Sequence, residues 1–116
     1  MSINMKESPI FIKTYDLMKW LLQHTQKFPK SQRFVLALRV QDSPLNFYET
    51  LIAAVRRKNA ADNLLQADSE LEKLRHHLRL CRDLQLLSIG RFNHAARIME
   101  EIGKLLGAWL KKARGE

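Results

Sequence analysis

The sequence predicts an all-α fold, an up-down-up-down four-helix bundle that forms one domain over residues 1–116. Four long segments carry apolar residues three and four positions apart, as one face of a helix requires. No segment shows the sustained alternation of apolar and polar residues that is typical of a half-buried strand. The connections between the segments are short, which favours antiparallel neighbours. A chain of 116 residues is also long enough to bury a core without a second domain.

The first two helices are expected over residues 9–26 and 31–57, after a flexible segment at residues 1–8. Pro9 suits the first turn of a helix that follows Ser8, and Ser31 is a candidate N-cap for the second helix. Pro44 falls inside the second helix, where it removes one backbone donor. Because the apolar pattern keeps its register across Pro44, we predict one kinked helix and not two. The inward positions of this helix are expected to be Phe34, Leu38, Gln41, Leu45, Tyr48, Ile52 and Val55.

The third and fourth helices are expected over residues 61–86 and 89–113, with a turn near residues 59–62 and an N-cap at Ser88. Both helices have a regular apolar stripe. On the third helix the stripe is Leu71, Leu74, Leu78, Cys81 and Gln85. On the fourth it is Phe92, Ala95, Met99, Ile102, Leu106, Trp109 and Ala113.

The last two helices carry more apolar surface than one bundle needs. The surplus positions lie beside the inward stripes and are Leu80, Leu84, Leu87, Ile98 and Leu105. Such second faces often mark contacts between subunits, so we expect an oligomer. Gly103 and Gly107 lie inside the fourth helix, where each glycine costs up to about 1 kcal/mol relative to alanine. We therefore expect another backbone to pass close to both glycines.

The charge, the cysteine content and the apolar runs of the sequence indicate the kind of partner and the cellular compartment to expect. The net charge is +8 and the isoelectric point is about 10.0, which favours a polyanionic partner such as nucleic acid. Cys81 is the only cysteine, and the start of the chain does not resemble a signal peptide, so a reducing, cytoplasmic location is expected. No apolar run approaches the roughly 20 residues that a membrane-spanning helix needs.

Nothing in the sequence predicts an enzyme, a metal site or a cofactor. No phosphate-binding loop or nucleophile elbow occurs. His77 and Cys81 lie four residues apart on one helix face, but no second pair completes a tetrahedral metal site. Glu100 and Glu101 are followed by Lys104, and this spacing favours a salt-bridged surface.

Three arginines, Arg75, Arg79 and Arg82, share one side of the predicted third helix. Two interpretations remain open. The arginines either pair with nearby acids such as Asp68 and Glu72, or they contact phosphates. The cations at the end of the second helix are further candidates for phosphate contacts, and they are Arg56, Arg57 and Lys58. Aromatic residues do not alternate with these charges, so base stacking is not expected.

Three segments resemble a known family: FPKSQRF, LRHHLRLCRDLQLLS and MEEIGKLLGAWLKK. The chain from about Ile10 onward resembles the accessory variability determinant (Avd) proteins of diversity-generating retroelements. These belong to a wider four-helix-bundle family that includes proteins encoded in ribosomal-RNA intervening sequences. The segments 31–32 and 43–46 depart from the intervening-sequence pattern and favour the retroelement branch.

The resemblance implies a barrel-shaped homopentamer that binds the retroelement reverse transcriptase and nucleic acid and is needed for mutagenic cDNA synthesis. It places Arg75 and Arg79 on the family's arginine helix, and Gly103, Gly107 and Trp109 in its fourth-helix packing motif. Our hypothesis is therefore a non-enzymatic accessory protein in a ring-like homo-oligomer. Its partners would be a reverse transcriptase and RNA or an RNA–DNA hybrid, bound without sequence preference. The alternative is a purely structural interaction protein whose basic residues serve solubility and helix pairing.

Overall fold

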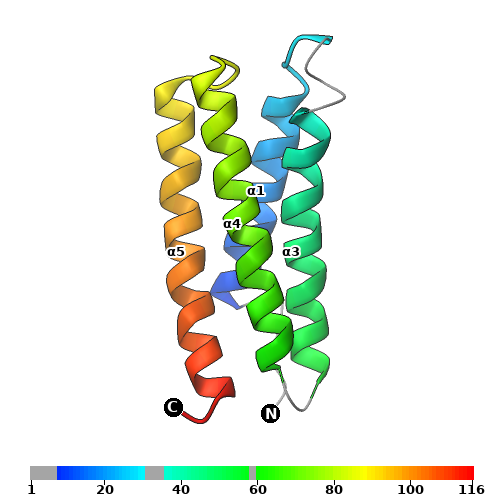
Figure 1. The fold of residues 1–116 in the computed structure, drawn as a ribbon, viewed down its shortest axis with the longest axis vertical. Coiled ribbons are helices and arrows are strands. Elements are labelled where there is room, and N and C mark those ends of the chain that lie inside the picture. Colours follow the sequence, from blue (N-terminus) through cyan, green and yellow to red (C-terminus); the bar gives the residue numbers. More distant parts are fainter. Residues whose placement is uncertain (1–7, 31–35, 58–59) are drawn as a thin grey trace.

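Four antiparallel helices pack side by side in the computed structural model, which describes residues 8–30, 36–57 and 60–116 (Figure 1). The helices are α1 (Pro9–Thr25), α3 (Leu38–Arg56), α4 (Ala61–Asp83) and α5 (Ile89–Ala113). Each of α3 and α5 packs against both α1 and α4, so α3 and α5 occupy opposite corners of a square. The described ranges contain no strand. This arrangement confirms the predicted all-α four-helix bundle.

The stripes predicted on the last two helices contribute to the core, which also contains buried residues of α1 and α3. Leu71, Leu74, Leu78 and Cys81 of α4 are all at most 1% exposed. On α5 the buried residues are Ala95, Met99, Ile102 and Leu106. Since each of these helices has a single strongly apolar stripe, the register could be predicted from spacing.

The start of α1 and the start of α5 differ in how they are capped. Ser88 accepts a hydrogen bond from the backbone N–H of Arg91 at 3.1 Å, which confirms the predicted cap of α5. Ser8 is extended at the N-cap of α1, but its side chain makes no capping bond. Pro9 begins α1 as predicted, and the helix ends at Thr25, one residue before the predicted end. The expected flexible segment lies outside the described residues, except for Ser8.

α3 is one continuous helix through the buried Pro44, as predicted, although the kink itself stays a prediction. The inward face predicted for α3 is wrong by one position. Leu38 and Leu45 are 48% and 42% exposed. The residues that are buried instead lie one position earlier along the chain, at Ala37, Val40, Pro44, Phe47, Leu51 and Ala54.

Two overlapping apolar patterns explain this error. Both patterns have alternating spacings of three and four residues, but the predicted one contains the polar Gln41 and Tyr48. Gln41 lies at the edge of the core, where its side-chain amide donates to Thr25 Oγ1 at 2.9 Å. Tyr48 is half-buried against Phe11. Phe34 and Ser31, also part of the predicted second helix, lie outside the described residues.

α4 ends at Asp83 and not at residue 86, and Gln85 is exposed and not inward. Gln85 has a φ of 63°, the left-handed conformation. Its N–H donates to the Arg82 carbonyl at 2.9 Å, and the Leu86 N–H donates to the Cys81 carbonyl at 2.8 Å. These two bonds form a Schellman motif, in which glycine is the usual left-handed residue. The turn places Leu87 in the core at 4% exposure, and burial of a leucine, worth about 1.5–3 kcal/mol, outweighs strain of about 1–2 kcal/mol at Gln85.

The surplus apolar residues divide into three groups by their exposure. Leu87 is buried within its own chain, so the expectation that another subunit covers it is wrong. Ile98 and Leu105 are half-buried against the core of the same chain. Leu80 and Leu84 are exposed, at 44% and 51%. None of the described helices is both long and apolar enough to cross a membrane.

Candidate nucleic-acid interface

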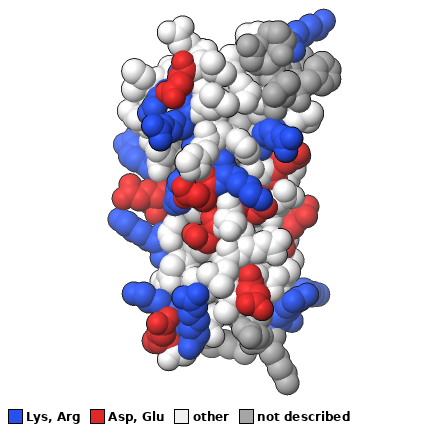
Figure 2. All heavy atoms as spheres, viewed as in Figure 1, with Lys and Arg blue, Asp and Glu red and all other residues white. Residues whose placement is uncertain are grey.

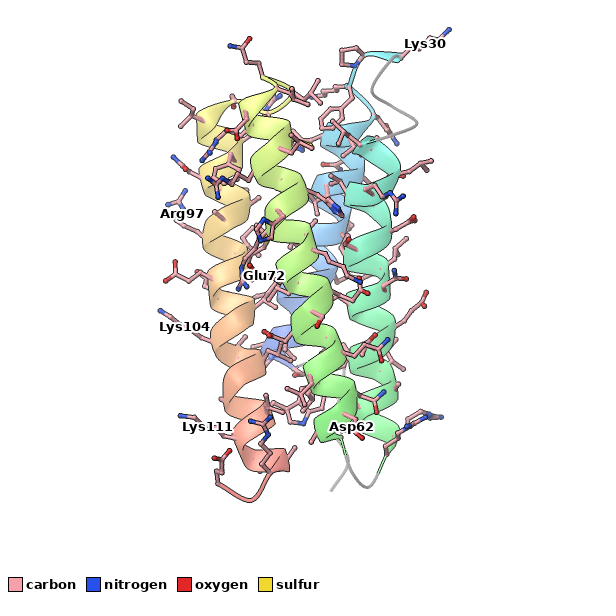
Figure 3. All side chains as sticks on the ribbon, viewed as in Figure 1. Lys30, Asp62, Glu72, Arg97, Lys104 and Lys111 are labelled. Carbon is pink, nitrogen blue, oxygen red and sulfur yellow. The ribbon has the colours of Figure 1, made fainter. Side chains whose placement is uncertain are left out.

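A groove between α4 and α5 contains most of the predicted arginine stripe. Its volume is about 310 Å³. In the face shown in Figure 2, basic and acidic side chains are interspersed over α4 and α5. Glu72 lies on the side of α4 that faces α5 (Figure 3). The lining residues are Glu72, Arg75, His76, Arg79, Phe92, Ala96, Met99 and Glu100.

Arg75 lies across this groove and is held at both ends of its guanidinium. Nη1 donates to Glu72 Oε2 at 2.8 Å. Nη2 lies close to α5, where a Cβ added to Gly103 would be only 2.8 Å away. Gly103 is therefore a site of close approach, as predicted, but the neighbour is a guanidinium and not a helix backbone.

Glu72 is the acidic centre of the groove. Its second carboxylate oxygen lies 3.2 Å from Nε2 of His76. The hydrogen bond from Arg75 is the main cause that holds the pKa of Glu72 below its usual value. The carboxylate is thus ionised at neutral pH and offsets the charge of Arg75.

Arg82 is also paired within its own helix. Its Nε and Nη2 donate to Asp83 Oδ1 at 3.1 and 2.9 Å. The guanidinium carbon lies 4.6 Å from the centre of the Phe92 ring, a cation–π contact between α4 and α5. Arg82 therefore has both a counter-charge and a packing role.

Arg79 differs from the other two arginines of the stripe. It is exposed, lines the groove, and forms no hydrogen bond or ion pair with any residue in the described ranges. Asp68, which we considered as an acidic partner for the stripe, forms no ion pair there either. The structure thus pairs Arg75 and Arg82 with acids, whereas Arg79 has no such partner among the described residues.

The cations at the end of α3 belong to a different part of the surface. Arg56 is the last residue of α3 and Arg57 is extended beyond it, both exposed. Arg79 lies 18 residues into α4, about 27 Å along the helix axis from the same end of the bundle. Arg57 instead borders a second hollow of about 470 Å³. Lys58 lies outside the described residues.

The predicted packing residues of α5 lie in three different environments. Gly103 contacts Arg75, as described above. An added Cβ at Gly107 would meet no atom of the described residues within 4 Å, so no close approach occurs there within one chain. Trp109 is half-buried, lines the second hollow, and has its ring centre 6.4 Å from that of Phe11.

The residues considered for metal binding do not form a site in the described part of the chain. No group of three or more His, Cys, Asp or Glu residues converges there. Cys81 is fully buried, and this burial raises the pKa of its thiol to about 11. Cys81 is thus a small core residue with a protonated thiol at neutral pH.

Comparison with known protein families identifies one matching family model. A sequence model of the bAvd-like family matches residues 10–113. The chain belongs to the bAvd-like family. The match extends from the first turn of α1 to the last residue of α5 and confirms the resemblance to Avd proteins. No curated protein sequence matches the chain.

This bAvd-like chain carries a further group of cations that we did not single out from the sequence. Arg97, Lys104 and Lys111 are exposed on α5 and project from one side of the molecule (Figure 3). Each lies two residues after an inward position of α5, so all three lie opposite the core. Their seven-residue spacing was a signal in the sequence. We considered Lys111 as part of a basic helix end, and Lys104 as a partner of Glu100. The pairing of Lys104 with Glu100 is confirmed at 3.8 Å.

Glu101, the other acid that we assigned to a salt-bridged surface, pairs with a different helix. Its Oε2 lies 2.7 Å from Nζ of Lys13 on α1. The hydrogen bond from Lys13 is the main cause that lowers the pKa of Glu101. The bAvd-like chain therefore has an ion pair between α1 and α5 that spacing within one helix could not predict.

Proposed function

We propose that this chain is an accessory protein of a diversity-generating retroelement, and that it binds the reverse transcriptase and nucleic acid to support mutagenic cDNA synthesis. The nucleic acid would be the RNA template or the RNA–DNA product. The proposal is supported by membership of the bAvd-like family over residues 10–113. It assigns no chemical step to this chain, which would act by positioning its partners.

The observation that carries the nucleic-acid part of the proposal is the guanidinium of Arg79 in the groove between α4 and α5, which pairs with no described residue. A guanidinium is suited to phosphate because it is always charged and presents several N–H donors in one plane. The net charge of +8 adds a long-range attraction for polyanions. Contacts to phosphate position a nucleic acid but carry no sequence information.

Several copies of the chain would act together. We propose a ring-like homo-oligomer, a pentamer by resemblance to the family, in which one groove from each subunit contacts the same strand or duplex. Once one subunit is bound, the other subunits of the same oligomer are held close to the nucleic acid. Their binding is then intramolecular, which raises the overall affinity above that of a single subunit. One weak phosphate contact per subunit is then sufficient.

Salt-titrated binding of the purified protein to mixed-sequence RNA and to an RNA–DNA hybrid tests the nucleic-acid part. We expect binding with little sequence preference that weakens with salt, by about 0.7–0.9 in log–log slope per phosphate contact. The enzyme part is tested by coexpression with a retroelement reverse transcriptase. Coelution of the two proteins through size-exclusion chromatography is expected, and separate elution would contradict it.

The alternative, a purely structural interaction protein, is favoured by the internal pairing of Arg75 with Glu72 and of Arg82 with Asp83. In this case the stripe is a salt-bridged helix surface. Any binding to the two nucleic acids would then come from the net charge alone and would not depend on Arg79, so titration of an Arg79→Gln variant would match that of the wild type. The same titration therefore separates the two functions.

A further inference from the structure

The outward side of α3 carries a regular pattern of leucines and acids. Leu38, Asp42, Leu45 and Glu49 follow one another at spacings of four, three and four residues, so they form one stripe along the helix. Each of the two acids lies two residues after a buried residue, Val40 or Phe47, and therefore points away from the core. We call these four residues the α3 stripe.

The α3 stripe has no partner in the described part of the chain. Leu38 and Leu45 are 48% and 42% exposed. Asp42 and Glu49 are exposed and form no ion pair or hydrogen bond with any described residue. An exposed stripe with two leucines and two uncompensated carboxylates is suited to a partner that offers cations at the same spacing.

The outward side of α5 offers such cations, of which Lys104 also pairs with Glu100 of its own helix at 3.8 Å. Arg97 and Lys104 are seven residues apart, about 10.5 Å along the helix, and Asp42 and Glu49 have the same separation. Lys111 continues the row by another seven residues, and the exposed Ala108 lies between Lys104 and Lys111. We call Arg97, Lys104 and Lys111 the α5 stripe.

The positions of the two stripes rule out contact within one chain. α3 and α5 occupy opposite corners of the bundle, with α1 and α4 packed between them (Figure 1). The two helices run in the same direction (Figure 1). A rotation about an axis parallel to the bundle keeps this direction, so the α5 stripe of one copy can lie parallel to the α3 stripe of the next.

We infer that the α3 stripe binds the α5 stripe of a second copy of this chain, with Asp42 and Glu49 facing Arg97 and Lys104. The contact is heterologous, because it joins two different faces, and repetition of such a contact gives a closed ring or a filament. This inference rests on the homo-oligomer of the proposed function and identifies its interface. A nucleic acid does not suit the α3 stripe, because the two carboxylates repel phosphate.

Charge reversal on each stripe tests the contact. The first variant carries Asp42→Lys and Glu49→Lys, and the second carries Arg97→Glu and Lys104→Glu. All four side chains are exposed, so each subunit should keep its helical circular dichroism. Each variant places like charges across the interface, and we expect the dissociation constant of the oligomer to rise by about tenfold or more.

The third variant combines all four substitutions and restores opposite charges with their signs exchanged. We expect this variant to regain the mass of the wild-type oligomer in light scattering at low salt. Loss of assembly in both double variants, with recovery in the combined variant, requires that the two stripes face each other. A general effect of net charge would instead act on the two double variants in opposite directions, because the first adds positive charge and the second removes it.

Other outcomes overturn the inference in distinguishable ways. Double variants that keep the wild-type mass would place the interface elsewhere and leave the proposed oligomer intact. A wild-type chain of 13.6 kDa in solution would remove both the oligomer and this contact. Weaker RNA binding by the second variant at unchanged mass would assign the α5 stripe to phosphate and not to a second copy.

Discussion

The guanidinium of Arg75 on α4 occupies the space that a side chain at Gly103 on α5 would need, since an added Cβ would lie 2.8 Å from Nη2 of Arg75. Arg75 is also bound to Glu72 at 2.8 Å. The absence of a side chain at Gly103 therefore leaves room beside α5 for the guanidinium of Arg75. Arg75 differs in this respect from Arg79, which lies one turn further along the same helix and has no such contact among the described residues.

The first prediction compares the two mid-helix glycines of α5. Gly103→Leu should displace Arg75 and crowd Leu71, and should lower the free energy of unfolding by about 1–3 kcal/mol. Gly107→Leu is the matched control, since no described atom lies within 4 Å of its added Cβ. It should raise the free energy of unfolding by up to about 1 kcal/mol through helix propensity. Urea denaturation measures both values, and equal effects would contradict the described packing of Arg75.

The second prediction concerns the end of α4. Gln85 has a φ of 63°, which glycine adopts without the steric cost that other residues have. Gln85→Gly should raise the free energy of unfolding by about 0.5–1 kcal/mol, because relief of strain exceeds the entropy cost of glycine. Gln85→Ala retains the Cβ and should give no such gain. A Gln85→Gly protein that melts below the alanine variant would contradict the left-handed turn.

The third prediction is a pH dependence that arises from His77. Its pKa is below the ordinary value of 6.5 mainly because burial disfavours the charged ring, and Arg39, His76 and Lys73 add repulsion. Nδ1 of His77 is buried and has no hydrogen-bond partner in the described residues. As pH falls below about 6.5, the unfolded chain therefore binds a proton at this site before the folded chain does, and stability decreases.

His77→Gln removes this titration. The difference in unfolding free energy between wild type and His77→Gln should shift in favour of the variant as pH falls from about 8 to about 5. Denaturation of both proteins by urea at several pH values gives that difference directly. A difference that is independent of pH would show that His77 titrates alike in the folded and unfolded chains.

Spacing along the sequence was sufficient to predict the buried face of a helix when only one set of positions three and four apart is strongly apolar. All leucine, isoleucine and methionine residues of the predicted α4 and α5 stripes are buried, so burial follows the pattern there. α3 has two registers of similar hydrophobicity, and the choice between them depends on how Phe47 and Leu51 pack against neighbouring helices. Spacing within one helix does not contain that information.

In the candidate site, too, spacing predicted which residues share a helix face but not which residues they contact. The arginine stripe was visible because three residues share one side of a helix, but its pairing depends on side-chain positions. Glu72 could reach either Arg75 or His76 and contacts both, whereas Asp83 pairs with its direct neighbour Arg82. The contact between Arg75 and Gly103 joins two helices, and so does the cation–π contact of Arg82 with Phe92. Such contacts between helices could not be obtained from periodicity.

Our claim is that Arg79 contacts phosphate, whereas Arg82 stabilises the packing of α4 against α5. The salt dependence of RNA binding distinguishes these two roles. Arg79→Gln and Arg82→Gln remove the same charge from the same helix, so each is the matched control for the other. We expect Arg79→Gln to reduce the log–log slope of the binding constant against salt by about 0.7–0.9 per contacting subunit, with helical content and oligomer mass unchanged. Arg82→Gln should leave the slope close to that of the wild type. An unchanged slope for the correctly assembled Arg79→Gln protein would contradict the claim and favour the structural alternative.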